Sequence, residues 1–181
     1  YLVAPARMPD ELTWFKWEAY TTWLSGFALL TLIYYTGTGL YLIDAEILDI
    51  TPWQAIALSV GGIIASWGAY DLMCRSPLGR SDRALALAGF VFLVVLAWLY
   101  TQIFSARGAF VQIGVCIGTI MVANVAMVII PGQKKVVAAL VAGETPDPAF
   151  GRRGKQRSLH NNYLTLPVVF VMIGGHYPAV F

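Results

Sequence analysis

Long apolar blocks alternate with short polar segments along the whole chain. Each block is close to the length of about 20 residues that a helix needs to cross a bilayer. Runs such as ALALAGFVFLVVLAWL lack the alternation of β-barrel strands. The pattern predicts an all-α fold, a polytopic integral membrane helical bundle that forms a single domain over residues 1–181. About five transmembrane helices are expected, spanning about residues 17–43, 52–73, 84–105, 109–131 and 163–181.

The polar segments between these blocks predict the connections. Thr51 is a suitable N-cap, and Pro52 suits the first position of the second helix. The stretch 132–162 predicts a long polar loop that holds a short interfacial helix, QKKVVAALVAG. The chain begins at Tyr1 and stops at Phe181 inside an apolar run, so we expect a fragment that lacks both ends of a longer protein.

Composition and charge narrow the picture further. Hydrophobic residues make up 58% of the 181 residues and charged ones only 12%, which excludes an ordinary soluble domain. No basic face supports a nucleic-acid partner. With five alternating spans, eleven of the twelve Lys and Arg residues share one side, and Arg107 lies opposite. By the positive-inside rule that side is the cytoplasm, so loops 74–83 and 132–162 are expected to be cytoplasmic.

His160, Asn161 and Asn162 stand together at the expected cytoplasmic mouth of the last helix. One interpretation is that an imidazole and two amides orient or deprotonate a small polar molecule. The alternative is that Ser158 or one of the asparagines caps the helix, and that His160 only meets lipid headgroups.

Other polar groups are expected within the membrane. Gln112 and Asn124 fall near one face of the fourth helix, where their amides could line a polar path or join helices. His176, in GGHYP, is a candidate metal or haem ligand, with simple packing as the alternative. It lies sixteen residues after His160, about 24 Å along a helix, so the two histidines cannot share one metal and any partner ligand must lie outside this chain. Asp71 and Arg75 predict an interfacial ion pair.

Several stretches resemble the membrane domain of the PuuD-type urate hydroxylase family. They are KWEAYTTWLSGF, YDLMCRSPLGRSDR, the segment around IIPGQ, and SLHNNYLTLP with the later HYP. The resemblance implies oxidation of urate to 5-hydroxyisourate in the bacterial inner membrane, with electrons passed to a c-type cytochrome. It also implies haem as a cofactor, b-type in the membrane and c-type in a domain outside this chain.

The resemblance and the residues together give a hypothesis for the site. Urate is an anion at neutral pH, so the basic residues before His160, Arg157 among them, could attract it. His160, Asn161 and Asn162 would form the catalytic group, with Arg157, Gln112 and Asn124 binding substrate. Two alternatives are a b-type haem electron-transfer subunit and a structural subunit of a larger membrane complex or homo-oligomer.

Overall fold

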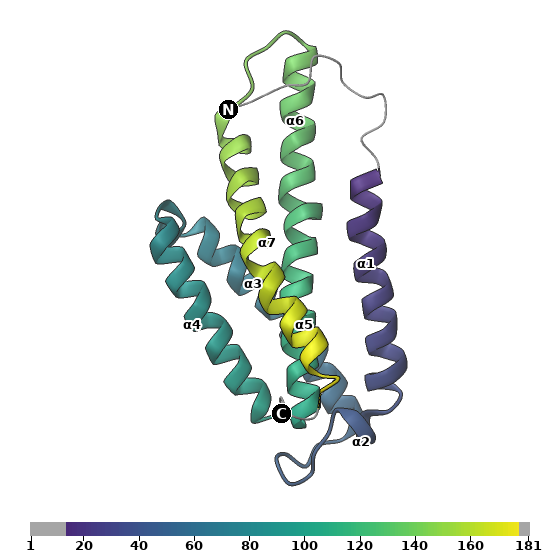
Figure 1. Cartoon of the computed structure of the whole chain (residues 1–181). Helices are drawn as coiled ribbons and strands as arrows, with labels where there is room; N and C mark the ends of the chain where they lie inside the picture. The colour runs from purple at the N-terminus through teal and green to yellow at the C-terminus, as the bar shows by residue number, and fades with distance from the viewer. Residues whose placement is uncertain (1–13, 178–181) are drawn as a thin grey trace.

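The computed structural model describes residues 14–177, and every regular element among them is a helix (Figure 1). The prediction of an all-α bundle is therefore confirmed. The elements in chain order are α1 (Trp14–Leu30), the π segment η1 (Thr31–Tyr35), α2 (Thr38–Tyr41), α3 (Pro52–Arg75), the 3₁₀ turn η2 (Pro77–Arg80), α4 (Asp82–Thr101), α5 (Ala106–Ala123), the π segment η3 (Asn124–Ile129), α6 (Ile130–Val141) and α7 (Pro148–Gly174).

Side-chain caps set the starts of the main helices. The predicted cap of α3 is confirmed: the Thr51 hydroxyl accepts from the Gln54 backbone N–H, and the Gln54 side chain accepts from the Thr51 backbone N–H. Ser81 caps α4, Ser105 caps α5 and Asp147 caps α7 through a single bond each, in which the side chain accepts from a backbone N–H of the first turn.

The segments α5, η3 and α6 form one continuous helix from Ala106 to Val141. Its 36 residues extend about 54 Å at 1.5 Å per residue, well beyond a hydrocarbon core of about 30 Å. The π turns end just before Pro131, whose ring would collide with the carbonyl four residues earlier in a regular α-helix. We attribute the local change to π geometry to this proline.

The helix expected over QKKVVAALVAG within the predicted loop 132–162 is present, but it continues the long helix to Val141 and does not stand alone. The rest of the predicted loop is wrong, because α7 begins at Pro148 and not near residue 163, which leaves only a turn at 142–147. Charged residues such as Lys134 and Lys135 end a membrane span, yet they are good helix formers and do not end the helix. The turn uses Gly143, whose φ of 74° lies in the left-handed region.

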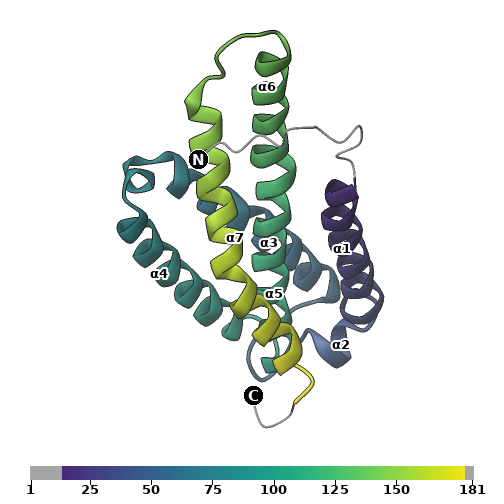
Figure 2. The same ribbon diagram turned by 45° about the horizontal axis from the view of Figure 1, so that its top comes forward.

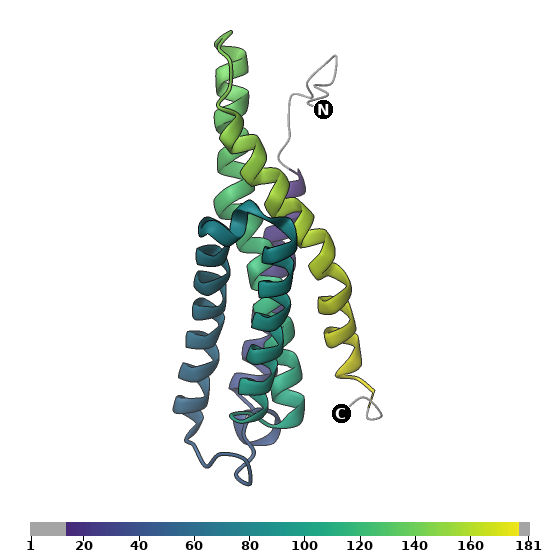
Figure 3. The same ribbon diagram turned by 90° about the vertical axis from the view of Figure 1, so that its left-hand side faces the viewer.

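Successive long helices run in opposite directions, and α7 crosses the face of α5 (Figures 1 and 3). A Cβ at Gly114 would lie 2.8 Å from the Met172 methyl carbon, so the end of the Met172 side chain packs directly on this glycine. The first half of α7 lies beside α6, and the two extend together past the ends of α3 and α4 (Figure 2). The polar residues of α7 therefore face the ends of several helices at once.

Three helices within residues 14–177 are long and apolar enough to cross a membrane: Pro52–Arg75, Asp82–Thr101 and Ala106–Val141. Many of their large apolar side chains point outward, such as Trp53, Leu87 and Phe90, as expected for helices in lipid. The predicted number of about five is not reached. α1 has only 17 regular residues before it changes to π geometry, α7 is polar in its first half, and the predicted end at residue 181 lies outside the described residues.

Candidate functional site

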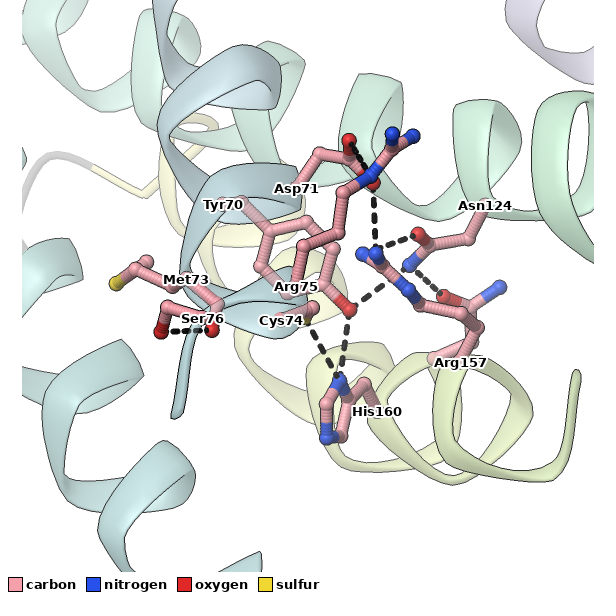
Figure 4. A network of polar contacts seen from close by, with 10 residues as sticks. Tyr70, Asp71, Met73, Cys74, Arg75, Ser76, Asn124, Arg157 and His160 are labelled. Atoms are coloured by element: carbon pink, nitrogen blue, oxygen red, sulfur yellow. Dashed lines mark hydrogen bonds and ion pairs between the residues drawn. The ribbon is translucent and has the colours of Figure 1, made fainter. Parts of the chain in front are cut away.

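A buried polar network joins α3, the start of η3 and α7 (Figure 4). Tyr70, Asp71, Asn124 and Arg157 are all buried, and His160 is half-buried beside them. Such a set of polar groups is costly in a bundle core unless each has a partner. Here each of them has at least one.

Asp71 forms two ion pairs at once. Its Oδ1 accepts from Arg157 Nη2 at 2.6 Å, and its Oδ2 pairs with Arg75 Nε, also at 2.6 Å. The predicted pair of Asp71 and Arg75 is thus confirmed. The stronger partner is Arg157, because its side chain is 5% exposed while that of Arg75 is 70% exposed.

Asn124 lies at the centre of the network. Its Oδ1 faces Arg157 Nη1 at 3.2 Å, and since a guanidinium can only donate, this contact fixes the orientation of the amide. Its Nδ2 then donates to the Tyr70 hydroxyl at 3.1 Å and to Asn161 Oδ1 at 3.0 Å. The Arg157 guanidinium also lies 5.0 Å from the centre of the Tyr70 ring.

The orientation of Asn124 determines the tautomer of His160. Because the Tyr70 oxygen accepts from Asn124, its own proton points to His160 Nδ1, 2.7 Å away. That nitrogen is a better acceptor than the Cys74 sulfur, which lies 3.9 Å from it. The network therefore assigns the proton of neutral His160 to Nε2, the nitrogen that points away from the network (Figure 4).

The surroundings favour neutral His160. Burial, and then the positive charge of Arg157, lower the pKa of His160 below its ordinary value, while Asp82 acts weakly in the other direction. A lowered pKa keeps Nδ1 unprotonated near neutral pH. In the resulting chain of hydrogen bonds, Arg157 donates to Asn124, Asn124 donates to Tyr70, and Tyr70 donates to His160 Nδ1.

The spacing of residues on α7 explains why they converge. Arg157, His160 and Asn161 stand at i, i+3 and i+4, on one face of the helix. Asn161 Nδ2 also donates to the Met121 carbonyl at 3.0 Å, so the amide of Asn161 has protein partners at both ends. The alternative in which Ser158 or an asparagine caps this helix is wrong, because α7 begins ten residues earlier with Asp147 as its cap.

Three predicted site residues lie apart from the network. Asn162 is exposed on another face of α7. Gln112 is fully buried in the first half of α5, where both of its polar amide atoms lack a hydrogen-bond partner within the described residues. His176 is exposed in the turn after α7, where its backbone N–H donates to the Ile173 carbonyl. Their assigned roles remain predictions.

A cavity of about 460 Å³ adjoins the network between α3, the η3–α6 junction and α7. Asp71, Cys74 and Arg157 belong to both the network and the cavity wall. Further cations in the wall are Arg75, Lys135 and Arg153. The buried network is therefore reached from a cavity that is rich in positive charge.

Sequence reasoning missed Tyr70, Cys74 and the second partner of Asp71. The signal was present in the spacing of Arg157, His160 and Asn161. A loop prediction over residues 132–162 hides this pattern, because helical spacing has no meaning in a loop. Read as a helix, the segment presents one polar face that needs buried partners.

The donor set does not fit a bis-histidine haem. The chain has two histidines. His160 Nδ1 is bound by Tyr70, and His176 is exposed in the turn that follows the far end of α7. Within residues 14–177 no three His, Cys, Asp or Glu side chains group in a way that could hold a metal ion.

Comparisons with known proteins give one finding. A family model described as urate oxidase N-terminal matches residues 1–181. No curated protein and no solved structure matches the chain.

Proposed function

The chain belongs to the urate oxidase N-terminal family, and we propose that it takes part in the membrane-bound oxidation of urate to 5-hydroxyisourate. In this reaction water supplies the added oxygen, and urate and water together release two electrons and two protons. We propose a c-type cytochrome as the electron acceptor. Any haem would then be held with residues outside this chain, since the ligands present do not form a pair.

The observation that carries the proposal is the one-directional chain of hydrogen bonds that ends on neutral His160. An unprotonated imidazole near neutral pH is suited to take up a proton. We assign this role to His160 Nδ1. The Tyr70 hydroxyl passes its proton to Nδ1 as it receives one from the reacting molecule, and the second of the two protons leaves to solvent, so the proton count balances.

The other residues of the network have supporting roles. Arg157 holds the orientation of Asn124 and brings positive charge close to the site where an anion would bind. Asn124 and Asn161 are positioning residues, because their amide groups are already used within the protein. Asn162 remains a candidate for contact with substrate from the exposed face of α7.

We also propose a bacterial inner-membrane location with five spans. In addition to the three long apolar helices, the apolar run of α1 continues through η1 to Tyr35, and the second half of α7 is apolar. The positive-inside rule favours the cytoplasm for the end of the bundle that carries Arg75, Arg80 and Lys135. Homo-oligomers or a larger membrane complex are further proposed partners.

The test is urate-dependent reduction of cytochrome c by the full-length protein in membranes. His160→Ala should lower kcat by about 100-fold or more, the range typical for loss of a general base, and Tyr70→Phe should also lower it. Ser158→Ala changes an exposed neighbour on α7 and serves as the control. Undiminished urate oxidation by a folded His160→Ala protein would refute the assignment, and Asn162→Ala in the same assay decides the role of that side chain.

A further inference from the structure

We infer that the cavity beside the network is a binding site for a small planar organic anion, through which urate reaches the buried Tyr70 and His160. The inference rests on the proposed function and adds two residues that sequence reasoning did not connect with substrate, Lys135 on α6 and Phe150 on α7. It also gives a specific place to Arg153 on α7, which the sequence predicts only as one of several basic residues that attract urate.

Charge is the first argument. The cavity wall holds four cationic side chains and one carboxylate, a net charge of +3. The carboxylate is Asp71, and both of its oxygens are already bound by arginines. Neither Arg153 nor Lys135 forms an ion pair with any residue between 14 and 177. Their charges are therefore available to an anion that enters the cavity.

Shape and polarity are the second argument. Phe150, Met127 and Val128 give the wall an apolar part, and the Lys135 ammonium lies 4.8 Å from the centre of the Phe150 ring. The volume of about 460 Å³ is within the range of about 300–1,000 Å³ for small-molecule sites. A wall that combines cations with aromatic and aliphatic surface suits a flat organic anion better than a strongly hydrated inorganic ion.

Position is the third argument. Arg153, Gln156 and Arg157 stand at i, i+3 and i+4 on α7, so one helix face contributes all three to the wall. Gln156 Nε2 donates to the Gly79 carbonyl at 2.8 Å, which holds this face of α7 against η2. From the wall, Cys74 Sγ lies 3.9 Å from His160 Nδ1. One residue of the cavity wall, Cys74, thus contacts the proposed proton acceptor.

The test compares two double variants of the full-length protein in lipid nanodiscs. Lys135→Gln with Arg153→Gln removes two charges from the cavity wall. Lys134→Gln with Arg152→Gln removes two charges from exposed neighbours outside the wall and is the matched control. Binding of radiolabelled urate and the kinetics of cytochrome c reduction are measured for each. All four residues are exposed, so both proteins should fold, and the single variant Arg153→Gln carries the test if a double variant does not.

We expect the cavity variant to bind urate at least about tenfold more weakly, from the loss of charge-assisted hydrogen bonds, with a matching rise in KM and kcat retained. The control should change binding by less than about twofold. Equal effects of the two double variants would overturn the inference, because they would indicate general electrostatic attraction.

A lipid phosphate could use the same cations, so the measurements are made with phosphatidylcholine alone and with added phosphatidylglycerol. One contrary result is a cavity variant that binds urate as tightly as the wild type in phosphatidylcholine and differs from it only in no longer responding to added phosphatidylglycerol. That result would assign the cavity to a lipid headgroup and overturn the inference. If the cavity variant oxidises urate with the same kinetics as the wild type, the inferred binding site is refuted while the proposed function stands. If the wild type binds urate more tightly than the cavity variant but does not oxidise it, the binding site stands and the proposed function is refuted.

Discussion

Replacing Asp71 by asparagine should destabilise the protein far more than breaking its second ion pair. Asp71→Asn removes the charge that compensates Arg157, whose side chain is 5% exposed. Removing one partner of a buried pair costs about 3–5 kcal/mol, because the other charge stays buried without compensation. Arg75→Gln breaks only the contact to a side chain that is 70% exposed, which costs about 0–1 kcal/mol. The expected difference between the two variants is therefore at least about 2 kcal/mol.

The measurement is the apparent free energy of unfolding of the full-length protein in mixed micelles, followed by circular dichroism during titration with a denaturing detergent. A third variant combines Asp71→Asn with Arg157→Met, which removes the uncompensated cation. It should recover part of the loss, since the remaining penalty is the unpaired Asn124 carbonyl oxygen. If Asp71→Asn costs no more than Arg75→Gln, the argument that Arg157 is a buried charge held by Asp71 is refuted.

Two further predictions concern His160 and a close contact between helices. Because the folded protein lowers the pKa of His160, its contribution to stability should be complete above the unfolded pKa of about 6.5 and be lost as the pH falls through the lower folded value. Thermal unfolding at several pH values should show a steeper acid loss for the wild type than for His160→Gln, and parallel curves would contradict this. A Cβ at Gly62 would collide with the Tyr100 hydroxyl, whereas one at Gly61 would meet open space. Gly62→Ala should therefore lower the free energy of unfolding by about 1–3 kcal/mol, and Gly61→Ala should be neutral or raise it by up to about 1 kcal/mol; equal values for the two would contradict the packing argument.

Apolar patterning was enough to predict the helical fold, because lipid-exposed backbone must form its own hydrogen bonds. The start of α3 also followed from Thr51 and Pro52 alone. The ends of the long helix and of α7 did not follow. A change from apolar to polar residues marks where a span leaves the membrane, but it does not mark where the helix ends. Residues such as Lys134, Lys135 and Gln156 are as compatible with a helix as the apolar residues before them.

The site was predicted in part. His160, Asn161, Asn124 and Arg157 do meet, as a polar cluster near one end of the bundle. Tyr70 could not be found in the same way, because an aromatic residue near a helix end is as typical of a membrane-interface anchor as of a buried hydrogen-bond donor. Helical periodicity groups Gln112 with Asn124, but their spacing of twelve positions separates the two by about 18 Å along the axis.

The π turns at Asn124–Ile129 also set the angular register of everything that follows them. In an α-helix each residue turns the chain by about 100°, since 3.6 residues complete a turn. A π turn accommodates one extra residue, because its hydrogen bonds span five residues in place of four. A relative that lacked a single residue in this stretch, and so returned to α geometry, would keep the residue equivalent to Lys135 in the cavity wall and Asn124 in the network. Loss of one residue elsewhere between Asn124 and Lys135, with no π turn to absorb it, would rotate α6 by about 100° and separate anion capture from the buried hydrogen-bond chain.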